Sequence, residues 1–195
     1  LDHYEGYDVS ATADFSDLPF IGGDLRVQLQ WTHLVENTTV DATGVSDDYV
    51  GQCYDFGESC FNRDRSTGLF TWSSGDWTVN WVTRFMSGIS APEDALNYFD
   101  VANGGANPYT GAAFPAGVLE DVMDTYSIED FYYHNASVSY QYDDNTRVNV
   151  AITNVFDEEA PYYKSFFGFV DPQINTPQNT YDIVGQYVTA SVSYS

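Results

Sequence analysis

Three histidines, two cysteines and several groups of acidic residues are the side chains of this chain with the most obvious chemical potential. The histidines, His3, His33 and His134, are well separated in the sequence, and none lies in a nucleophile motif or a metal-binding motif. The pattern predicts no catalytic residue and no cofactor. We therefore expect the chain not to be an enzyme.

The acidic residues gather in groups whose carboxylates could collect calcium. These groups are Asp47-Asp48, Asp55 with Glu58, and Asp157-Glu158-Glu159. None of them has the regular ligand spacing of a calcium-binding loop. The sequence thus predicts solvated acidic segments and no metal site.

Cys53 and Cys60 lie in the polar, glycine-containing segment GQCYDFGESCFN. A disulfide there could close a small loop and would indicate an oxidising compartment. Two unpaired thiols are the alternative. Zinc binding is disfavoured because the spacing is wrong for a paired-cysteine site and no histidine is nearby in the sequence. We predict that the two cysteines are joined.

Aromatic residues in the long polar segments could stack on a flat ligand such as a sugar or a siderophore. The candidates are Tyr49, Tyr54, Phe56, Tyr98, Phe99, Tyr109 and Phe114. The alternative is that these side chains only pack the segments against one another.

Composition and charge narrow the class of protein. The net charge is −23, from 29 acidic against six basic residues, so much of the surface would repel a polyanion and we expect no nucleic-acid partner. Aromatic residues make up 17% of the chain, with 16 Tyr and 13 Phe, which favours strands over helices. The chain is predicted to be all-β.

Apolar and polar residues alternate with a period of two in about seven segments, which predicts antiparallel strands. The predicted strands cover 7–15, 25–34, 67–72, 77–85, 132–142, 146–153 and 185–195. Their apolar positions carry no Lys, Arg, Asp or Glu, whereas the opposite positions carry Gln, Asn, Ser, Thr and Arg. In the last two strands we expect one apolar face to point outward, formed by Val148, Val150, Ile152, Val188, Ala190 and Val192.

Two classes of connection alternate along the chain. Short turns are predicted at 18–24, 73–76 and 143–146, and long acidic segments at 36–66, 88–130 and 157–182. Short turns on one side and long loops on the other are typical of transmembrane β-barrels, whose strands of about 10 residues alternate lipid-facing and lumen-facing side chains. We therefore expect the three long loops to lie together on one side, opposite the turns.

Two short motifs resemble the C-terminal end of TonB-dependent outer-membrane receptors. Asn154-Val155-Phe156-Asp157 resembles the family's turn after the penultimate strand. Tyr181-Asp182-Ile183-Val184-Gly185-Gln186 resembles the segment before the final strand, with Gln where Arg is common. The Gly-Asp turn near residue 75 and the cysteine pair before it are also similar to features of this family. The resemblance spans the chain and is strongest from Phe131 to Ser195.

The resemblance implies that residues 1–195 are the C-terminal portion of a receptor barrel, about its last seven strands, and that the family's plug domain lies outside this sequence. It implies a bacterial outer-membrane location and active import of a siderophore, vitamin or glycan. The implied partners are TonB, acting through the plug, the ligand, lipid and the barrel-assembly machinery. That machinery reads the final strand, here Val188, Val192 and Tyr194. A porin-like passive channel and a soluble extracellular glycan-binding β-domain are the alternatives.

Overall fold

The protein is described by a computed structural model that covers residues 2–40, 42–44, 46–54, 59–90, 112–113, 127–162 and 180–194. All regular structure in these ranges is β-strand. No helix in the described part of the chain is long and apolar enough to cross a membrane.

Seven long strands form one sheet in which every strand pairs antiparallel with its neighbours in the chain. They are β1 (Asp2–Phe15), β2 (Asp24–Val40), β6 (Asp64–Ser74), β7 (Trp77–Met86), β10 (Phe131–Gln141), β11 (Thr146–Thr153) and β12 (Tyr187–Tyr194). A short strand, β3 (Ser46–Asp48), pairs with the end of β2. The predicted all-β, antiparallel architecture and its seven main strands are confirmed.

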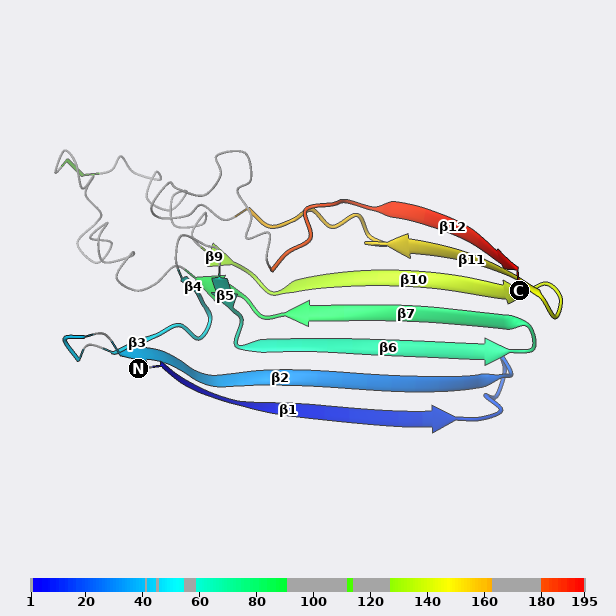
Figure 1. The fold of residues 1–195 in the computed structure, drawn as a ribbon, viewed down its shortest axis with the longest axis horizontal. Coiled ribbons are helices and arrows are strands. Elements are labelled where there is room, and N and C mark those ends of the chain that lie inside the picture. The colour runs from blue at the N-terminus through cyan, green and yellow to red at the C-terminus, as the bar shows by residue number, and fades with distance from the viewer. Residues whose placement is uncertain are drawn as a thin grey trace.

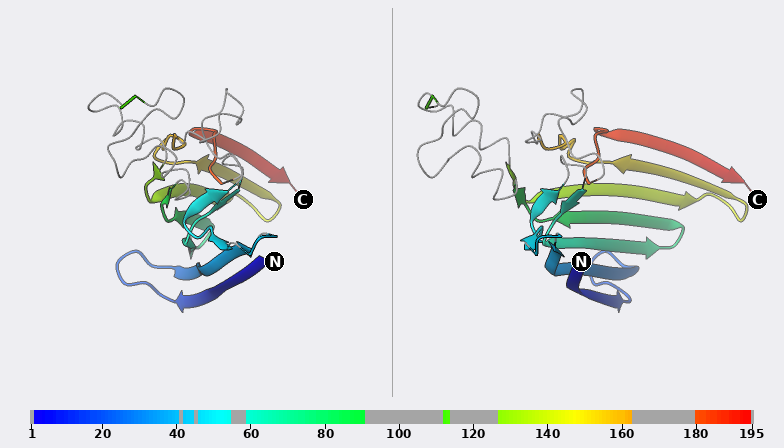
Figure 2. Two further views of the ribbon diagram at one scale, coloured as in Figure 1. Left: turned by 90° about the vertical axis from the view of Figure 1, so that its left-hand side faces the viewer. Right: turned by 60° about the vertical axis from the view of Figure 1, so that its left-hand side comes forward.

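The sheet is a curved, open wall (Figures 1 and 2). Within the described residues, β1 and β12 are its two edges, and each is paired along one side only. The structure therefore contains no closed barrel.

The connections fall on two opposite sides of the wall, as the sequence predicts. Short turns join β1 to β2, β6 to β7 and β10 to β11 on one side, and the described parts of the long connections lie on the other (Figure 1). We call these the turn side and the loop side. Gly75 has φ +55° in the two-residue turn between β6 and β7, where glycine adopts a left-handed conformation without strain.

Two details of the sequence prediction are wrong. The strands are longer on the loop side than the alternation indicated, because β1 begins at Asp2 and β2 continues to Val40. The segment 36–66 is thus partly strand, and it also contains β3, β4 (Gln52–Tyr54) and β5 (Ser59–Phe61). A β-bulge near Gly6 interrupts the β1–β2 register. Bulges break the alternation on which the prediction depended.

A second, small sheet lies at the loop side, in the order β5-β4-β8-β9, with β8 at Ile89–Ser90 and β9 at Ser127–Ile128. Cys53 of β4 and Cys60 of β5 face each other and form a disulfide, which confirms the predicted bond. Arg65 at the start of β6 donates to the Cys60 carbonyl (3.0 Å), which ties this disulfide hairpin to the main sheet.

The main buried cluster lies where the small sheet meets the main sheet. It consists of Cys53, Cys60, Met86, Ile89, Ile128, Phe131, Tyr133 and Tyr181. Met86 and Phe131 are cross-strand partners and share the face that carries Arg84. The loop-side strands that the structure describes therefore fold over the polar face of the wall rather than over the opposite face.

Removing the disulfide should loosen the loop side and leave the wall intact. The Cys53→Ala/Cys60→Ala variant lacks the bond that closes this short ring. The bond contributes roughly 2 to 3 kcal/mol at most to the stability of the loop side. Hydrogen exchange should accelerate in Gln52–Tyr54 and Ser59–Phe61. Exchange in β7 and β10 is the internal control, and faster exchange there as well would contradict a local role for the disulfide.

Candidate functional site: the outward face and the C-terminal clasp

One mostly apolar face runs across all seven long strands, because directly paired residues point to the same side of a sheet. Polar side chains on it include Thr83 and His134, which are cross-strand partners. The register joins Ala11, Leu29, Gly68 and Thr83 in one row. Other rows join Val79, Val138, Val150 and Ala190. We call this surface the outward face.

The outward face is exposed. In the last two strands, Val148 and Val150 are 37% and 41% exposed, and Val188 and Val192 are 61% and 70% exposed. Ile152 is half-buried and Ala190 is exposed. The predicted orientation of these six residues is confirmed. In a β-sandwich this face would pack against a second sheet, but here the small sheet covers the other face.

Aromatic residues border the outward face on both sides. On the loop side, Trp31, Phe85 and Tyr132 occupy one register row, and the rings of Phe85 and Tyr132 are 4.9 Å apart. On the turn side, the rings of Trp77 and Tyr140 are 4.5 Å apart. Aromatic residues at both borders of an apolar band are typical of surfaces that meet the two interfaces of a membrane.

The distance between the two aromatic borders matches a bilayer. Trp77 and Phe85 are eight positions apart in β7, and Tyr132 and Tyr140 are eight positions apart in β10. At ~3.4 Å per residue this is about 27 Å along a strand. A strand tilt of ~40° reduces the height to about 21 Å, close to the ~25 Å apolar band of outer-membrane barrels.

The expectation that outward positions carry no charged residue holds only between these borders. Asp64, Glu5 and Glu36 also lie on the outward face, at or beyond the loop-side border. Asp64 accepts hydrogen bonds from the Trp31 indole (2.9 Å) and is paired with His33 (2.7 Å). The expectation fails there because the strands extend past the apolar band.

The opposite, polar face holds hydrogen-bonded side chains and four of the six basic residues. These four are Arg26, Arg65, Arg84 and Arg147. Arg26 forms an ion pair with Asp14 (2.6 Å) across β1 and β2. The Arg84 guanidinium lies 5.2 Å from the centre of the Tyr133 ring. Such a face suits water or a polar ligand.

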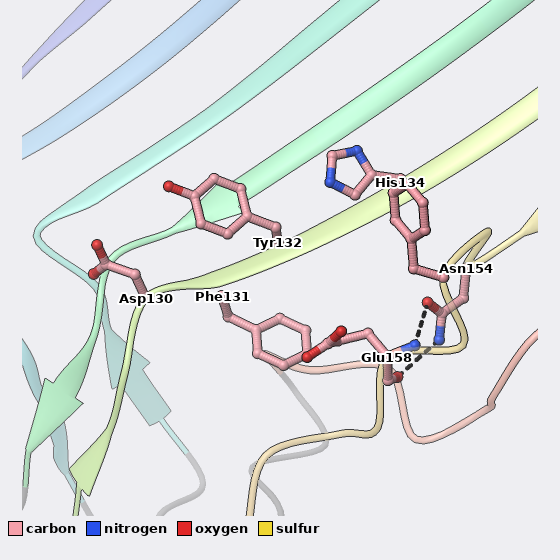
Figure 3. A pocket seen from close by; sticks show the side chains of 7 residues that line it. Asp130, Phe131, Tyr132, His134, Asn154 and Glu158 are labelled. Atoms are coloured by element: carbon pink, nitrogen blue, oxygen red, sulfur yellow. Dashed lines mark hydrogen bonds between the residues drawn. The ribbon is translucent and has the colours of Figure 1, made fainter.

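The two motifs that carry the family resemblance lie together in space. We call residues 154–158 and 181–186 the C-terminal clasp. Asn154 is 2% exposed, and its side chain accepts from the Glu158 amide (2.9 Å) and donates to the Glu158 carbonyl (2.8 Å), as Figure 3 shows. Its own amide donates to Asn135 of β10 (2.9 Å). Asn154 has φ +54°, a conformation that Asn tolerates better than most residues.

The second half of the clasp is bonded to the first. Asp157 accepts from the Gln186 amide (2.7 Å), and the Gln186 side chain donates to the Val155 carbonyl (2.8 Å). Gln186 stands where the family commonly has Arg, and its amide group supplies a donor at that position. The clasp therefore fixes the chain immediately before β12 against the end of β11.

Tyr181 anchors the clasp to the buried cluster. It is 1% exposed and packs edge-on against Phe131, with ring centres 5.4 Å apart. Burial raises the pKa of the Tyr181 hydroxyl, an effect that the hydrogen bond from Asn62 partly offsets. The neighbouring Asp182 exchanges backbone hydrogen bonds with the Tyr133 hydroxyl (both 2.9 Å).

A shallow hollow lies beside the clasp on the loop side (Figure 3). Its lining residues are Asp130, Phe131, Tyr132, His134, Asn154, Phe156 and Glu158. Tyr49, the predicted ligand-stacking residue whose side chain the structure describes, is not among them. His134 is bonded to Thr83 (3.0 Å) and contacts the Phe156 ring edge-on.

The structure describes only two of the seven predicted ligand-stacking aromatic residues. Phe56, Tyr98, Phe99, Tyr109 and Phe114 lie outside the described residues. Tyr54 is in β4, and Tyr49 is half-buried and bonded through its amide to the Asn37 carbonyl (3.0 Å). Their ligand role stays a prediction. The predicted assembly-signal residues Val188, Val192 and Tyr194 lie on the outward face of the edge strand β12, and their role also stays a prediction.

Two solved structures of siderophore receptors have a similar fold. The siderophore receptor PirA from Acinetobacter baumannii matches 98% of this chain at a TM-score of 0.55 and 16% identity. The ferric enterobactin receptor PfeA from Pseudomonas aeruginosa matches 98% at a TM-score of 0.53 and 11% identity. The chain spans 22% of the length of each. The sequence matches no protein-family model and no curated protein. The likeness therefore lies in the fold.

Substitutions at Asn154 should separate backbone strain from hydrogen bonding in the clasp. Asn154→Gly loses the bonds to Glu158 but tolerates the positive φ. Asn154→Ala loses the same bonds and adds about 1 to 2 kcal/mol of strain. We expect thermal unfolding to rank wild type above Gly and Gly above Ala. Equal midpoints for the two variants would show that the turn relaxes out of the left-handed region.

Proposed function

We propose that this chain is the C-terminal part of the barrel of a TonB-dependent outer-membrane receptor, which imports a scarce nutrient of the siderophore, vitamin or glycan class. The observation that carries the proposal is the outward face, an exposed apolar band with aromatic borders about one bilayer apart. The fold likeness to siderophore receptors and the two clasp motifs support it. In this proposal the chain is not an enzyme.

The proposal assigns a lipid or aqueous environment to each surface of the wall. The outward face contacts outer-membrane lipid, and the polar face, with Arg26, Arg84 and Arg147, lines a water-filled lumen. The loop side faces the outside of the cell, where ligand is first bound. TonB acts from the periplasmic side through a plug domain that is not among these 195 residues.

The two free edges support the view that the complete barrel has further strands. An unpaired backbone group in lipid costs several kcal/mol, so neither β1 nor β12 can remain half-paired in a membrane. The chain also spans about a fifth of the length of the solved receptors that it resembles. Strands from elsewhere in the same polypeptide would pair both edges.

The lipid contact can be tested on β12 with a matched pair of variants. Val192→Asp/Tyr194→Asp places two charges on the outward face, where a charge against lipid is destabilising to a degree that depends on its depth. Ser191→Asp/Ser193→Asp places the same charges on the polar face, where position 193 is paired with Arg147. We expect only the first variant to be depleted from the outer-membrane fraction. Equal levels of the two variants would argue against lipid contact and for the soluble β-domain.

Import can be tested with ferric enterobactin, the siderophore complex after which the structurally similar receptor PfeA is named. Cells that express the full natural polypeptide should accumulate the iron, and both a protonophore and loss of TonB should abolish uptake. Uptake that persists without TonB would support the porin-like channel. If this siderophore is not transported, vitamins and glycans are tested in the same assay, and failure of all three classes would refute the import proposal.

A further inference from the structure

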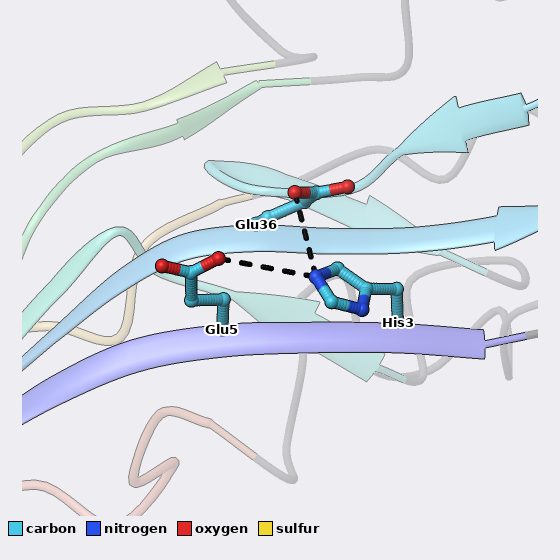
Figure 4. Close-up of side chains that lie close together, drawn as sticks. All are labelled: His3, Glu5 and Glu36. Carbon is cyan, nitrogen blue, oxygen red and sulfur yellow. Dashed lines mark ion pairs between the residues drawn. The ribbon is translucent and has the colours of Figure 1, made fainter.

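A histidine and two glutamates converge at the loop side of β1 and β2, where the sequence analysis predicted no metal site. The His3 Nε2 atom lies 3.9 Å from Glu5 Oε2 and 3.7 Å from Glu36 Oε2. The three potential ligand atoms all lie within 4.8 Å of one another. Figure 4 shows both glutamate carboxylates directed at the same imidazole nitrogen of His3. From this geometry we infer that His3, Glu5 and Glu36 bind a divalent cation of the zinc type.

Strand geometry explains the convergence. His3 and Glu5 are two residues apart in β1, so they point to the same side of the sheet, and Glu36 is the direct cross-strand partner of Glu5. The Cβ atoms of such partners are about 5 Å apart. Two residues from one strand and one from its neighbour can therefore present three ligand atoms to one point.

Ligand type and spacing fit zinc. One imidazole nitrogen and two carboxylate oxygens are ligands that zinc accepts, with bond lengths of about 2.0 to 2.2 Å. Tetrahedral geometry at those bond lengths places ligand atoms about 3.4 Å apart. Small side-chain rotations would shorten the observed distances between the ligand atoms to this value. The side chains of His3 and Glu5 are more than half exposed, which leaves the remaining coordination positions open to water.

Electrostatics gives an independent reason for a cation here. Like charges placed directly opposite each other destabilise a strand pair, yet Glu5 faces Glu36 in a chain with a net charge of −23. Among the described residues, the structure pairs neither glutamate with a lysine or an arginine, and His3 is their shared basic neighbour. A bound divalent cation would neutralise both carboxylates.

A hydrogen bond from Thr38, which is not itself a proposed metal ligand, orients the Glu36 carboxylate. The Thr38 hydroxyl donates to Glu36 Oε1 (2.9 Å), which leaves Oε2 directed at His3. Bonds of this kind fix the orientation of metal ligands, and their loss typically lowers metal affinity 10- to 100-fold. Thr38 is thus a positioning residue for the proposed site.

Zinc binding is measured by calorimetry on the full natural polypeptide, purified in detergent and stripped with a chelator, with Zn²⁺ alone as the probe. We expect one site that His3→Ala and Glu36→Gln each weaken at least tenfold. Thr38→Val should weaken it by about tenfold.

The matched control is Glu159→Gln, which removes one exposed loop-side carboxylate that lies outside the cluster. It should leave zinc affinity unchanged. If His3→Ala fails to assemble, Glu5→Gln replaces it in the comparison. Wild type that binds no zinc, or zinc affinity that His3→Ala and Glu36→Gln leave unchanged, would overturn the inference and indicate adventitious binding to the acidic surface. The measurement needs no transport, so its failure and the failure of the import proposal are distinguishable.

Discussion

The register between adjacent strands is the constraint on which the rest of the structure depends. Side chains alternate with a period of two, so a slip of one residue in any pair would move a whole strand's apolar residues to the polar face. Three consecutive pairings place Trp31 beside Ser66, Ser66 beside Phe85, and Phe85 beside Tyr132. Polar contacts on the other face, such as Thr71 to Asn80 (2.8 Å) and Ser139 to Asn149 (2.8 Å), reinforce the same alignment.

The loop side adds a second level of organisation to this wall. The small sheet, the disulfide and the clasp all meet at the buried cluster, so segments distant in the sequence hold one another in place. Asn62 illustrates this, because its side chain is bonded to the Ser87 carbonyl (2.6 Å), to Arg65 and to Tyr181. The turn side has no comparable cluster among the described residues. The loop side, where the proposed ligand would first be bound, is thus also the side that the disulfide and the clasp hold together.

The period-two pattern was sufficient to predict the strands, their faces and the sides on which the connections lie, because these depend on local alternation. Val148, Val150 and Ile152 could be placed from their own segment alone. The small sheet could not be predicted, because Gln52 pairs with Ser90, far away in the chain, through strands of two or three residues. The His3–Glu36 proximity was missed for the same reason, since only the β1–β2 register brings these residues together. The bulge near Gly6 carries no sequence signal that alternation would detect.

The alternation of short and long connections also has a consequence for folding order. The cost of closing a loop grows with the logarithm of its length, so a connection roughly twentyfold longer costs about 3 kcal/mol more. The two residues between β6 and β7 therefore close far more readily than the 87–130 connection between β7 and β10. Hairpins would form first as three preassembled pairs, β1–β2, β6–β7 and β10–β11, which then align edge to edge. The strand β12 is joined to its antiparallel partner β11 by a long connection, so it would pair later than the hairpins, when the clasp closes.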